Sequence, residues 1–255
     1  MLKYNPLNDI KCVIFDLDGT IYFGSQLAEQ ANEVIKTARL SCEKIFFVTN
    51  NSAKTRVQIF EKLVKLGVDV HLEEVINSGY AIAKYLKDNN YTEVYCLGTD
   101  DLADEIKSFG INTASKEPQA IVVGYDIDFS LSKLEPILNL SNNDYKIIIA
   151  NQERIYPRES GIITPGAGAI VAAVEYTLNK KKDLIIGKPN PLMLEVITKD
   201  LNLKPKEILV IGDSYDSDVK MAEAFGAKSI LVTNGDKAEY DCNTVKNLKD
   251  ILELL

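Results

Sequence analysis

The sequence contains little histidine and few cysteines, which limits the chemistry available to the protein. The single histidine among 255 residues, His71, lies in the polar stretch VDVHLEEV, which contains no catalytic carboxylate or serine motif, so we expect a structural or surface histidine. Serine–histidine, cysteine–histidine and multi-histidine zinc chemistry are therefore poor explanations of its function. The cysteines have no metal-type spacing, and we expect a reducing cytoplasm; they are Cys12, Cys42, Cys96 and Cys242.

The chain also lacks a long apolar run and an excess of basic residues. No run approaches the ~20 apolar residues of a membrane helix, and the stretch MLKYNPLNDIK has no signal-peptide core. The net charge of -8 gives no basic stripe for nucleic acid. We expect neither a membrane nor a nucleic-acid partner, while a local site can still bind small anions. The sequence leaves a homo-oligomer open.

Apolar strand patterns alternate with helical periodicity along the chain. We expect strands at 12–15, 44–48, 75–76, 93–97, 120–124, 146–150, 184–186, 208–211 and 229–232. We expect helices at 27–40, 54–66, 78–87, 100–109, 130–140, 167–178, 191–201, 217–225 and 245–254. The polar segment NKKKD at 179–183 is a plausible linker. This alternation predicts an α/β fold, with a doubly wound parallel sheet covered by helices on both faces.

The stretch CVIFDLDGT, residues 12–20, contains the strongest chemical signal. Its buried strand ends in Asp16, and Asp18 follows two residues later. Two carboxylates this close repel each other and lose hydration, and a divalent cation would relieve both costs. Gly19 permits a turn with unusual dihedral angles. The alternative is a solvated turn, because Asp and Gly are turn residues.

Complementary groups follow three other predicted strands. Thr49 can bind phosphate oxygens, or can simply form a turn. Lys188 can pair with a carboxylate and a phosphate, or can be exposed in its Gly-Pro turn. Asp213, Asp216 and Asp218 offer oxygen ligands for Mg²⁺, or can cap a helix. Ligands usually bind at the carboxyl ends of strands in α/β sheets, so the four strand ends together indicate one site.

The motifs DLDGT (16–20), TNN (49–51), GKP (187–189) and GDSYDSD (212–218) resemble, in this order, those of the haloacid dehalogenase (HAD) superfamily of phosphatases. The cap inserted before the GKP motif is similar to that of the nitrophenylphosphatase-like, NagD-type branch. This resemblance implies a Rossmann-like core at 1–79 and 184–255 and an inserted α/β cap domain at 80–183.

The resemblance also implies a mechanism. Asp16 would attack phosphorus and form an aspartyl-phosphate, and Asp18 would act as general acid and then as general base. Mg²⁺ would be bound by Asp16, the backbone carbonyl of Asp18, and Asp213. Asp218 or Asp216 would orient the metal shell, and Asp218 fits the family spacing better.

Phosphoryl oxygens would be held by Thr49, Asn50 and Lys188. The branch often has Asn-x-Asp after the cap strand, whereas this chain has Asn151 and Glu153, which become candidates for substrate specificity. The expected partner is a small phosphorylated metabolite. Three alternatives remain at this point: a phosphomutase or phosphotransferase, a phospho-accepting receiver-like domain, and a non-catalytic ligand-binding α/β protein.

Overall fold

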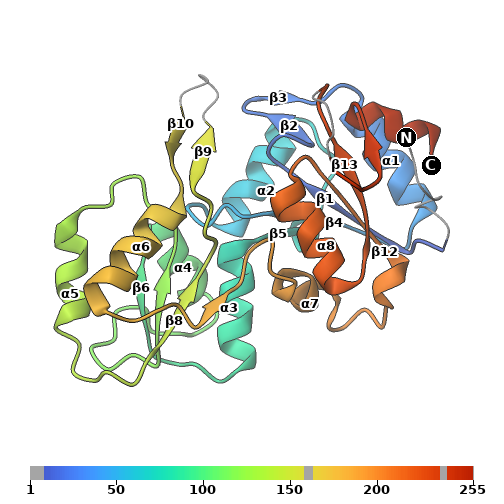
Figure 1. Cartoon of the computed structure of the whole chain (residues 1–255). Helices are drawn as coiled ribbons and strands as arrows, with labels where there is room; N and C mark the ends of the chain where they lie inside the picture. Colours follow the sequence, from blue (N-terminus) through green and yellow to red (C-terminus); the bar gives the residue numbers. More distant parts are fainter. Residues whose placement is uncertain (1–8, 158–162, 236–239, 255) are drawn as a thin grey trace. The chain divides into compact units, whose positions relative to one another are not determined.

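The computed structural model describes residues 9–157, 163–235 and 240–254 and divides into two compact units (Figure 1). The first unit consists of Met1–Thr49, Ile59–Ile76 and Lys188–Leu255. The second consists of Asn50–Gln58 and Asn77–Gly187. The predicted cap at 80–183 falls within the second unit, and its assignment as a cap stays a prediction.

The first unit is built on a six-stranded sheet with the order β14-β13-β12-β1-β4-β5. Its strands are β1 (Cys12–Asp16), β4 (Lys44–Thr49), β5 (Val75–Asn77), β12 (Ile208–Gly212), β13 (Lys228–Val232) and β14 (Thr244–Val245). Successive strands from β14 to β4 pair in parallel. The chain proceeds from β1 toward β4 on one side, and β12 returns on the other. The carboxyl ends of β1 and β12 therefore form a switch point, where α/β sheets usually bind ligands.

Apolar residues cover both faces of this sheet. On one face Phe15 and Phe47 stack with ring centroids 5.9 Å apart, in a core that includes Val34 and Leu63. On the other face Ile14 and Val210 are also buried. Fully burying a side chain of this size contributes roughly 1.5–3 kcal/mol. The elements around the sheet are β2 (Tyr22–Phe23), β3 (Gln26–Leu27), α1 (Ala31–Ser41), α2 (Arg56–Lys65), η1 (Leu72–Glu74), α7 (Leu192–Thr198), η3 (Pro205–Glu207), η4 (Tyr215–Val219), α8 (Lys220–Phe225) and η5 (Leu248–Glu253).

The second unit has its own parallel sheet, with the order β11-β8-β7-β6. The strands are β6 (Val94–Leu97), β7 (Ala120–Val123), β8 (Lys146–Ile149) and β11 (Leu184–Ile185). The helices are α3 (Ser78–Asp88), α4 (Asp100–Lys107), η2 (Leu131–Leu134), α5 (Glu135–Leu138) and α6 (Ala167–Leu178). An antiparallel pair, β9 (Ile155–Pro157) and β10 (Ile163–Pro165), adds a hairpin. Parallel sheets combined with helices confirm the predicted α/β class.

Two predictions around residue 184 need correction. The strand expected at 184–186 was assigned to the core, but Leu184 pairs with Ile148 of β8 in the second unit. A short apolar strand does not show in its sequence which sheet it joins. The segment expected as a linker at 179–183 is fixed to α6, because the carboxylate of Glu175 accepts hydrogen bonds from the Lys182 N–H and the Lys181 ammonium, both at 2.9 Å.

Several predicted helices start or end differently. The helix expected at 27–40 begins only at Ala31, because residues 26–27 form β3. The helix expected at 78–87 extends to Asp88, and Asn77 caps it by accepting a hydrogen bond from the Tyr80 N–H. Pro136 leaves the expected helix at 130–140 as a short 3₁₀ turn and one α turn. Strand β14 and a 3₁₀ helix replace the helix expected at 245–254. Within the described ranges, no helix has the length and hydropathy needed to cross a membrane.

Candidate active site

Three predicted site residues lie at the carboxyl ends of neighbouring strands in the first unit. Asp16 is the last residue of β1, Thr49 is the last residue of β4, and Asp213 directly follows β12. The register pairs Asp16 with Val48, so Thr49 comes one residue later on the adjacent strand. The predicted convergence of strand ends therefore holds for these three residues.

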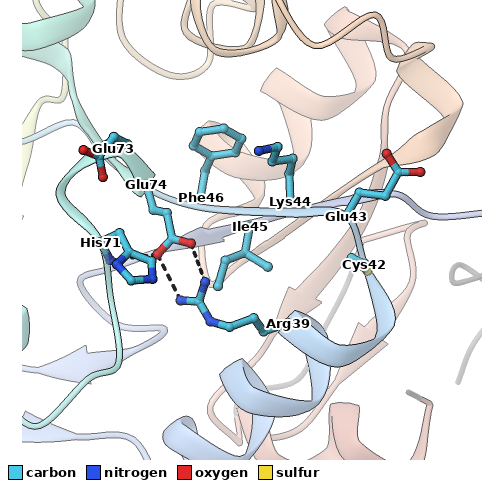
Figure 2. A pocket seen from close by; sticks show the side chains of 9 residues that line it. All are labelled: Arg39, Cys42, Glu43, Lys44, Ile45, Phe46, His71, Glu73 and Glu74. Atoms are coloured by element: carbon cyan, nitrogen blue, oxygen red, sulfur yellow. Dashed lines mark hydrogen bonds and ion pairs between the residues drawn. The ribbon is translucent and has the colours of Figure 1, made fainter.

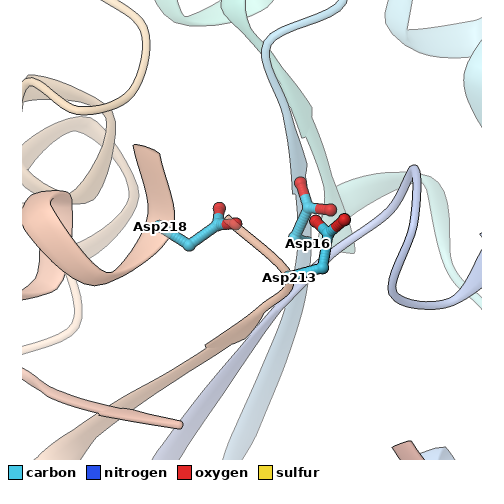
Figure 3. Close-up of side chains that lie close together, drawn as sticks. All are labelled: Asp16, Asp213 and Asp218. Atoms are coloured by element: carbon cyan, nitrogen blue, oxygen red, sulfur yellow. The ribbon is translucent and has the colours of Figure 1, made fainter. Parts of the chain in front are cut away.

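A cluster of three carboxylates lies at this edge of the sheet (Figure 3). Asp16, Asp213 and Asp218 each offer an oxygen, and these atoms lie within 4.8 Å of one another. Asp218 comes from η4, a π-helical turn, and its Oδ2 accepts a hydrogen bond from the Ser214 N–H at 3.1 Å. A Cβ atom at Gly212 would lie 2.3 Å from that same oxygen, so the close approach of Asp218 to the strand requires glycine there.

Lys188 connects two of these carboxylates. Its side chain is only 3% exposed, and its Nζ donates to Oδ1 of Asp16 and to Oδ1 of Asp218, the latter at 2.7 Å. A buried ammonium held between two carboxylates is stable only because its charge is compensated. The three carboxylates and the single ammonium leave an excess of negative charge when all are ionised.

The excess of negative charge contributes to shifts in the pKa values of the clustered groups. Burial raises the pKa of Asp16 well above its ordinary value, since the attraction of Lys188 is opposed by repulsion from Asp218 and Asp213. Burial, followed by repulsion from Asp218, raises the pKa of Asp213 to about 7. Burial works to lower the pKa of Lys188, but its two carboxylate partners raise it overall. The ionised cluster thus carries an excess of negative charge, which a divalent cation would balance.

The carboxylate of Asp18 lies outside this group of three among the described residues. Its Oδ2 accepts a hydrogen bond from the hydroxyl of Tyr22 at 3.0 Å. Between them Gly19 adopts a left-handed φ of +88°, and a Cβ there would lie 2.2 Å from Oδ2 of Asp213. Gly19 is therefore required both by the turn and by the closeness of Asp213.

The structure separates the two candidates in the GDSYDSD motif. Asp218 is buried within the cluster, whereas the side chain of Asp216 is 75% exposed and pairs with Lys220 at 2.5 Å. The geometry therefore favours Asp218 for the metal shell.

The remaining candidates interact within the second unit. The side-chain amide of Asn50 donates to Oε1 of Glu153 at 2.8 Å, and the side-chain amide of Asn151 donates to the backbone carbonyl of Asn50 at 2.8 Å. Thr49 and Asn50, which are consecutive, are divided between the two units. The structure thus groups Asn50 with the two specificity candidates.

His71 is exposed at the surface, which agrees with the expectation of a structural or surface histidine. It lines a hollow of about 280 Å³ in the first unit, together with Arg39 and Glu74, which form a bidentate ion pair (Figure 2). The hollow also includes Lys44, the first residue of β4, so it lies at the opposite end of that strand from Thr49.

The hydrogen bond between Tyr22 and Asp18 was not identified from the sequence. It joins residues four apart across a turn. Nothing in the residue pattern distinguishes this tyrosine from an ordinary core aromatic.

Comparisons with known proteins agree with these motifs. Residues 13–112 match the family of haloacid dehalogenase-like hydrolases, and residues 185–253 match a second HAD-like hydrolase model. The sugar-phosphatase AraL of Bacillus subtilis is 32% identical over 251 residues, which cover 95% of this chain and 92% of the relative.

Solved structures with the same fold carry the same kind of name. The 4-nitrophenylphosphatase of Thermotoga maritima superposes with a TM-score of 0.89 at 29% identity, covering 97% of this chain and 98% of its own. A structure named as a NagD protein has a TM-score of 0.88 at 29% identity, with 97% and 98% covered. The chain therefore belongs to the haloacid dehalogenase-like hydrolases, and within them it is a NagD-type phosphatase that hydrolyses phosphoric monoesters.

Proposed function

We propose that this phosphatase is Mg²⁺-dependent and hydrolyses small phosphate monoesters by transferring the phosphoryl group to Asp16. The observation that carries the proposal is the cluster of Asp16, Asp213 and Asp218, in which the buried Asp16 and Asp218 are both paired with the buried Lys188. Burying charged groups costs free energy of hydration, so their retention at this position supports a functional role for the cluster.

The donor set fits Mg²⁺. All three donors are carboxylate oxygens, which this hard cation prefers over nitrogen and sulfur. Asp16, Asp213 and the backbone carbonyl of Asp18 would hold the ion, with Asp218 orienting the shell. When bound, Mg²⁺ would neutralise negative charge on the phosphoryl group.

In the first step a carboxylate oxygen of Asp16 forms a bond to phosphorus, while the bond from phosphorus to the leaving oxygen breaks. Lys188 holds Oδ1 of Asp16 and so orients the nucleophile. Asp18 transfers its proton to the leaving oxygen, which departs as a neutral alcohol.

In the second step water attacks phosphorus and Asp18 removes its proton. The bond from phosphorus to Asp16 breaks, and inorganic phosphate is released. Thr49, Asn50 and Lys188 would hold the phosphoryl oxygens, on which the transition-state charge is spread.

Residues 80–183 would form the cap that excludes water and reads the leaving group. Asn151 and Glu153 are the specificity candidates, and the hydrogen bond from Asn50 to Glu153 supports this role because it links them to the TNN motif. A carboxylate there would favour substrates with amines or hydroxyls and disfavour a second phosphate.

We extend the proposal to a reducing compartment such as the cytoplasm, since all four cysteines are free thiols. The excess of negative charge supports a small metabolite rather than nucleic acid as the partner.

A panel of phosphate monoesters tests this function. Sugar phosphates come first, because a relative is named a sugar-phosphatase. We expect free phosphate to appear with Mg²⁺, to stop with chelator and to return when Mg²⁺ is restored, whereas Asp16→Asn should be inactive. Full activity after exhaustive chelation would contradict the metal assignment. Return of the phosphate to a substrate hydroxyl, without release, would instead indicate a phosphomutase.

A further inference from the structure

We propose that Tyr22 is a positioning residue for the general acid Asp18, an inference that rests on the proposed function. The hydroxyl of Tyr22 donates to Oδ2 of Asp18 at 3.0 Å, within the first unit. Hydrogen bonds weaken steeply when their angle departs from the preferred range, so this contact restricts rotation of the Asp18 carboxyl group. The contact therefore fixes which way the Asp18 carboxyl group faces.

The turn that contains both residues is itself well ordered. The N–H groups of Ile21 and Tyr22 both donate to the carbonyl of Leu17, at 2.9 and 3.1 Å, and the Gly19 N–H donates to the carbonyl of Tyr22 at 2.8 Å. The side-chain amide of Asn234 donates to the carbonyl of Gly19 at 2.9 Å. The backbone thus places Asp18 and Tyr22 on opposite sides of one closed turn.

The ring of Tyr22 is fixed by a second contact. It is only 3% exposed, and the Nζ of Lys62 on α2 lies 3.8 Å from its centroid, within the range of a cation–π interaction. Its neighbour Phe23, on the same short strand, is 49% exposed. A buried phenol whose ring is covered by the Lys62 ammonium gives its hydroxyl a defined direction.

This direction determines where the catalytic proton is carried. Because Oδ2 of Asp18 accepts the tyrosine hydrogen, a proton on the carboxyl group resides on Oδ1. During phosphoryl transfer that proton moves from Oδ1 to the leaving oxygen, while the hydroxyl hydrogen stays on Tyr22. Loss of the hydroxyl leaves the acid chemically intact but lets its carboxyl group rotate away from the leaving oxygen.

The experiment measures kcat/KM, which reports the steps up to phosphoryl transfer, for esters with leaving groups of increasing basicity. Good leaving groups such as 4-nitrophenolate need little protonation, whereas phenolate and alkoxides need it strongly. We expect Tyr22→Phe to keep kcat/KM for 4-nitrophenyl phosphate within about threefold of the parent value. For phenyl and alkyl phosphates it should lower kcat/KM roughly tenfold to a hundredfold. That loss stays within the range of general acid catalysis.

The matched control is Tyr145→Phe. Tyr145 is also buried, at 7% exposed, and also has a lysine, Lys180, over its ring at 4.5 Å, but it lies in the core of the second unit. This variant should leave the whole series unchanged. Thermal unfolding of both variants checks that they are folded.

Asp18→Asn on the same series separates the two claims. One outcome refutes the positioning role while the proposed function stands. In it, the loss of kcat/KM caused by Asp18→Asn grows with leaving-group basicity, whereas Tyr22→Phe lowers kcat/KM equally for all esters or for none. If Asp18→Asn shows no such dependence, the general-acid assignment itself fails. In the Asp18→Asn background, adding Tyr22→Phe should not steepen the dependence of kcat/KM on leaving-group basicity. A steeper dependence in the double variant would contradict the proposal.

Discussion

Replacing Lys188 by methionine tests how the acidic cluster is stabilised. Lys188 is 3% exposed, and Asp16 and Asp218, which it contacts, are at most 9% exposed. At 2.7 Å and an effective dielectric constant of about 20, the contact with Asp218 contributes about 6 kcal/mol of gross attraction, most of which offsets lost hydration. Removing one partner of a buried pair costs about 3–5 kcal/mol net.

For a chain of this size that cost lowers the melting temperature of the metal-free protein by roughly 6–20 °C. The loss should shrink as pH falls from 7 toward 5.5, because the carboxylates left behind take up protons more readily in the folded than in the unfolded state. Mg²⁺ should restore part of the lost melting temperature, since the ion replaces the positive charge that Lys188→Met removes.

The assay is thermal unfolding with and without Mg²⁺. Lys220→Met is the control, because Lys220 pairs with Asp216 at 2.5 Å but on the surface, where the side chains are 49% and 75% exposed. That variant should melt close to the parent. A metal-free Lys188→Met protein as stable as the parent, with no response to Mg²⁺, would refute the reasoning.

Three further predictions follow from the structure. Glu153→Ala should change the ranking of substrates yet keep 4-nitrophenyl phosphate hydrolysis within about tenfold; an unchanged ranking would remove Glu153 from specificity. The pKa of Glu175 is lowered to about 2 by its Lys182 N–H and Lys181 contacts, so it stabilises the fold above pH 4.5 and this contribution is lost as pH falls toward 2. Glu175→Gln should therefore lower the melting temperature at pH 7 by an amount that shrinks at pH 3, and a pH-independent shift would argue against the charged contacts. Gly19→Ala should abolish activity because its Cβ would clash with the Asp213 carboxylate. Gly67 has a similar φ of +83°, but a Cβ there would have no atom within 4 Å, so Gly67→Ala should lose only stability. Equal activities of the Gly19→Ala and Gly67→Ala variants would show that the clash does not control activity.

The strand ends of the site could be predicted because buried strands have a clear apolar pattern and parallel strands present their carboxyl ends at one edge. Asp16, Thr49 and Asp213 all follow such strands, and their meeting requires only the α/β class. Lys188 follows a strand of the other unit, so the topology of the sheet alone does not bring it to Asp16.

Other features depend on information that the pattern does not contain. The residue pattern alone does not choose between Asp216 and Asp218; the family spacing favours Asp218, and both residues lie in a π-helical turn, which shifts side chains relative to an α-helix. The hairpin of β9 and β10 was missed because its strands have three residues each and both end in proline. The contact between Asn50 and Glu153 joins residues 103 apart. Glu153 therefore contacts the TNN motif, which its position in the sequence does not reveal.

The central claim is that Asp16 carries the phosphoryl group, and a burst experiment with Asp18→Asn tests it most directly. With 4-nitrophenyl phosphate and Mg²⁺ the first step needs little acid, while the second step loses its base, so the intermediate should accumulate. We predict a burst of one nitrophenolate per enzyme. Peptide mapping after acid quench should then find one phosphoryl group on the peptide that contains Asp16. No burst, or a phosphoryl group on a different residue, would contradict the account.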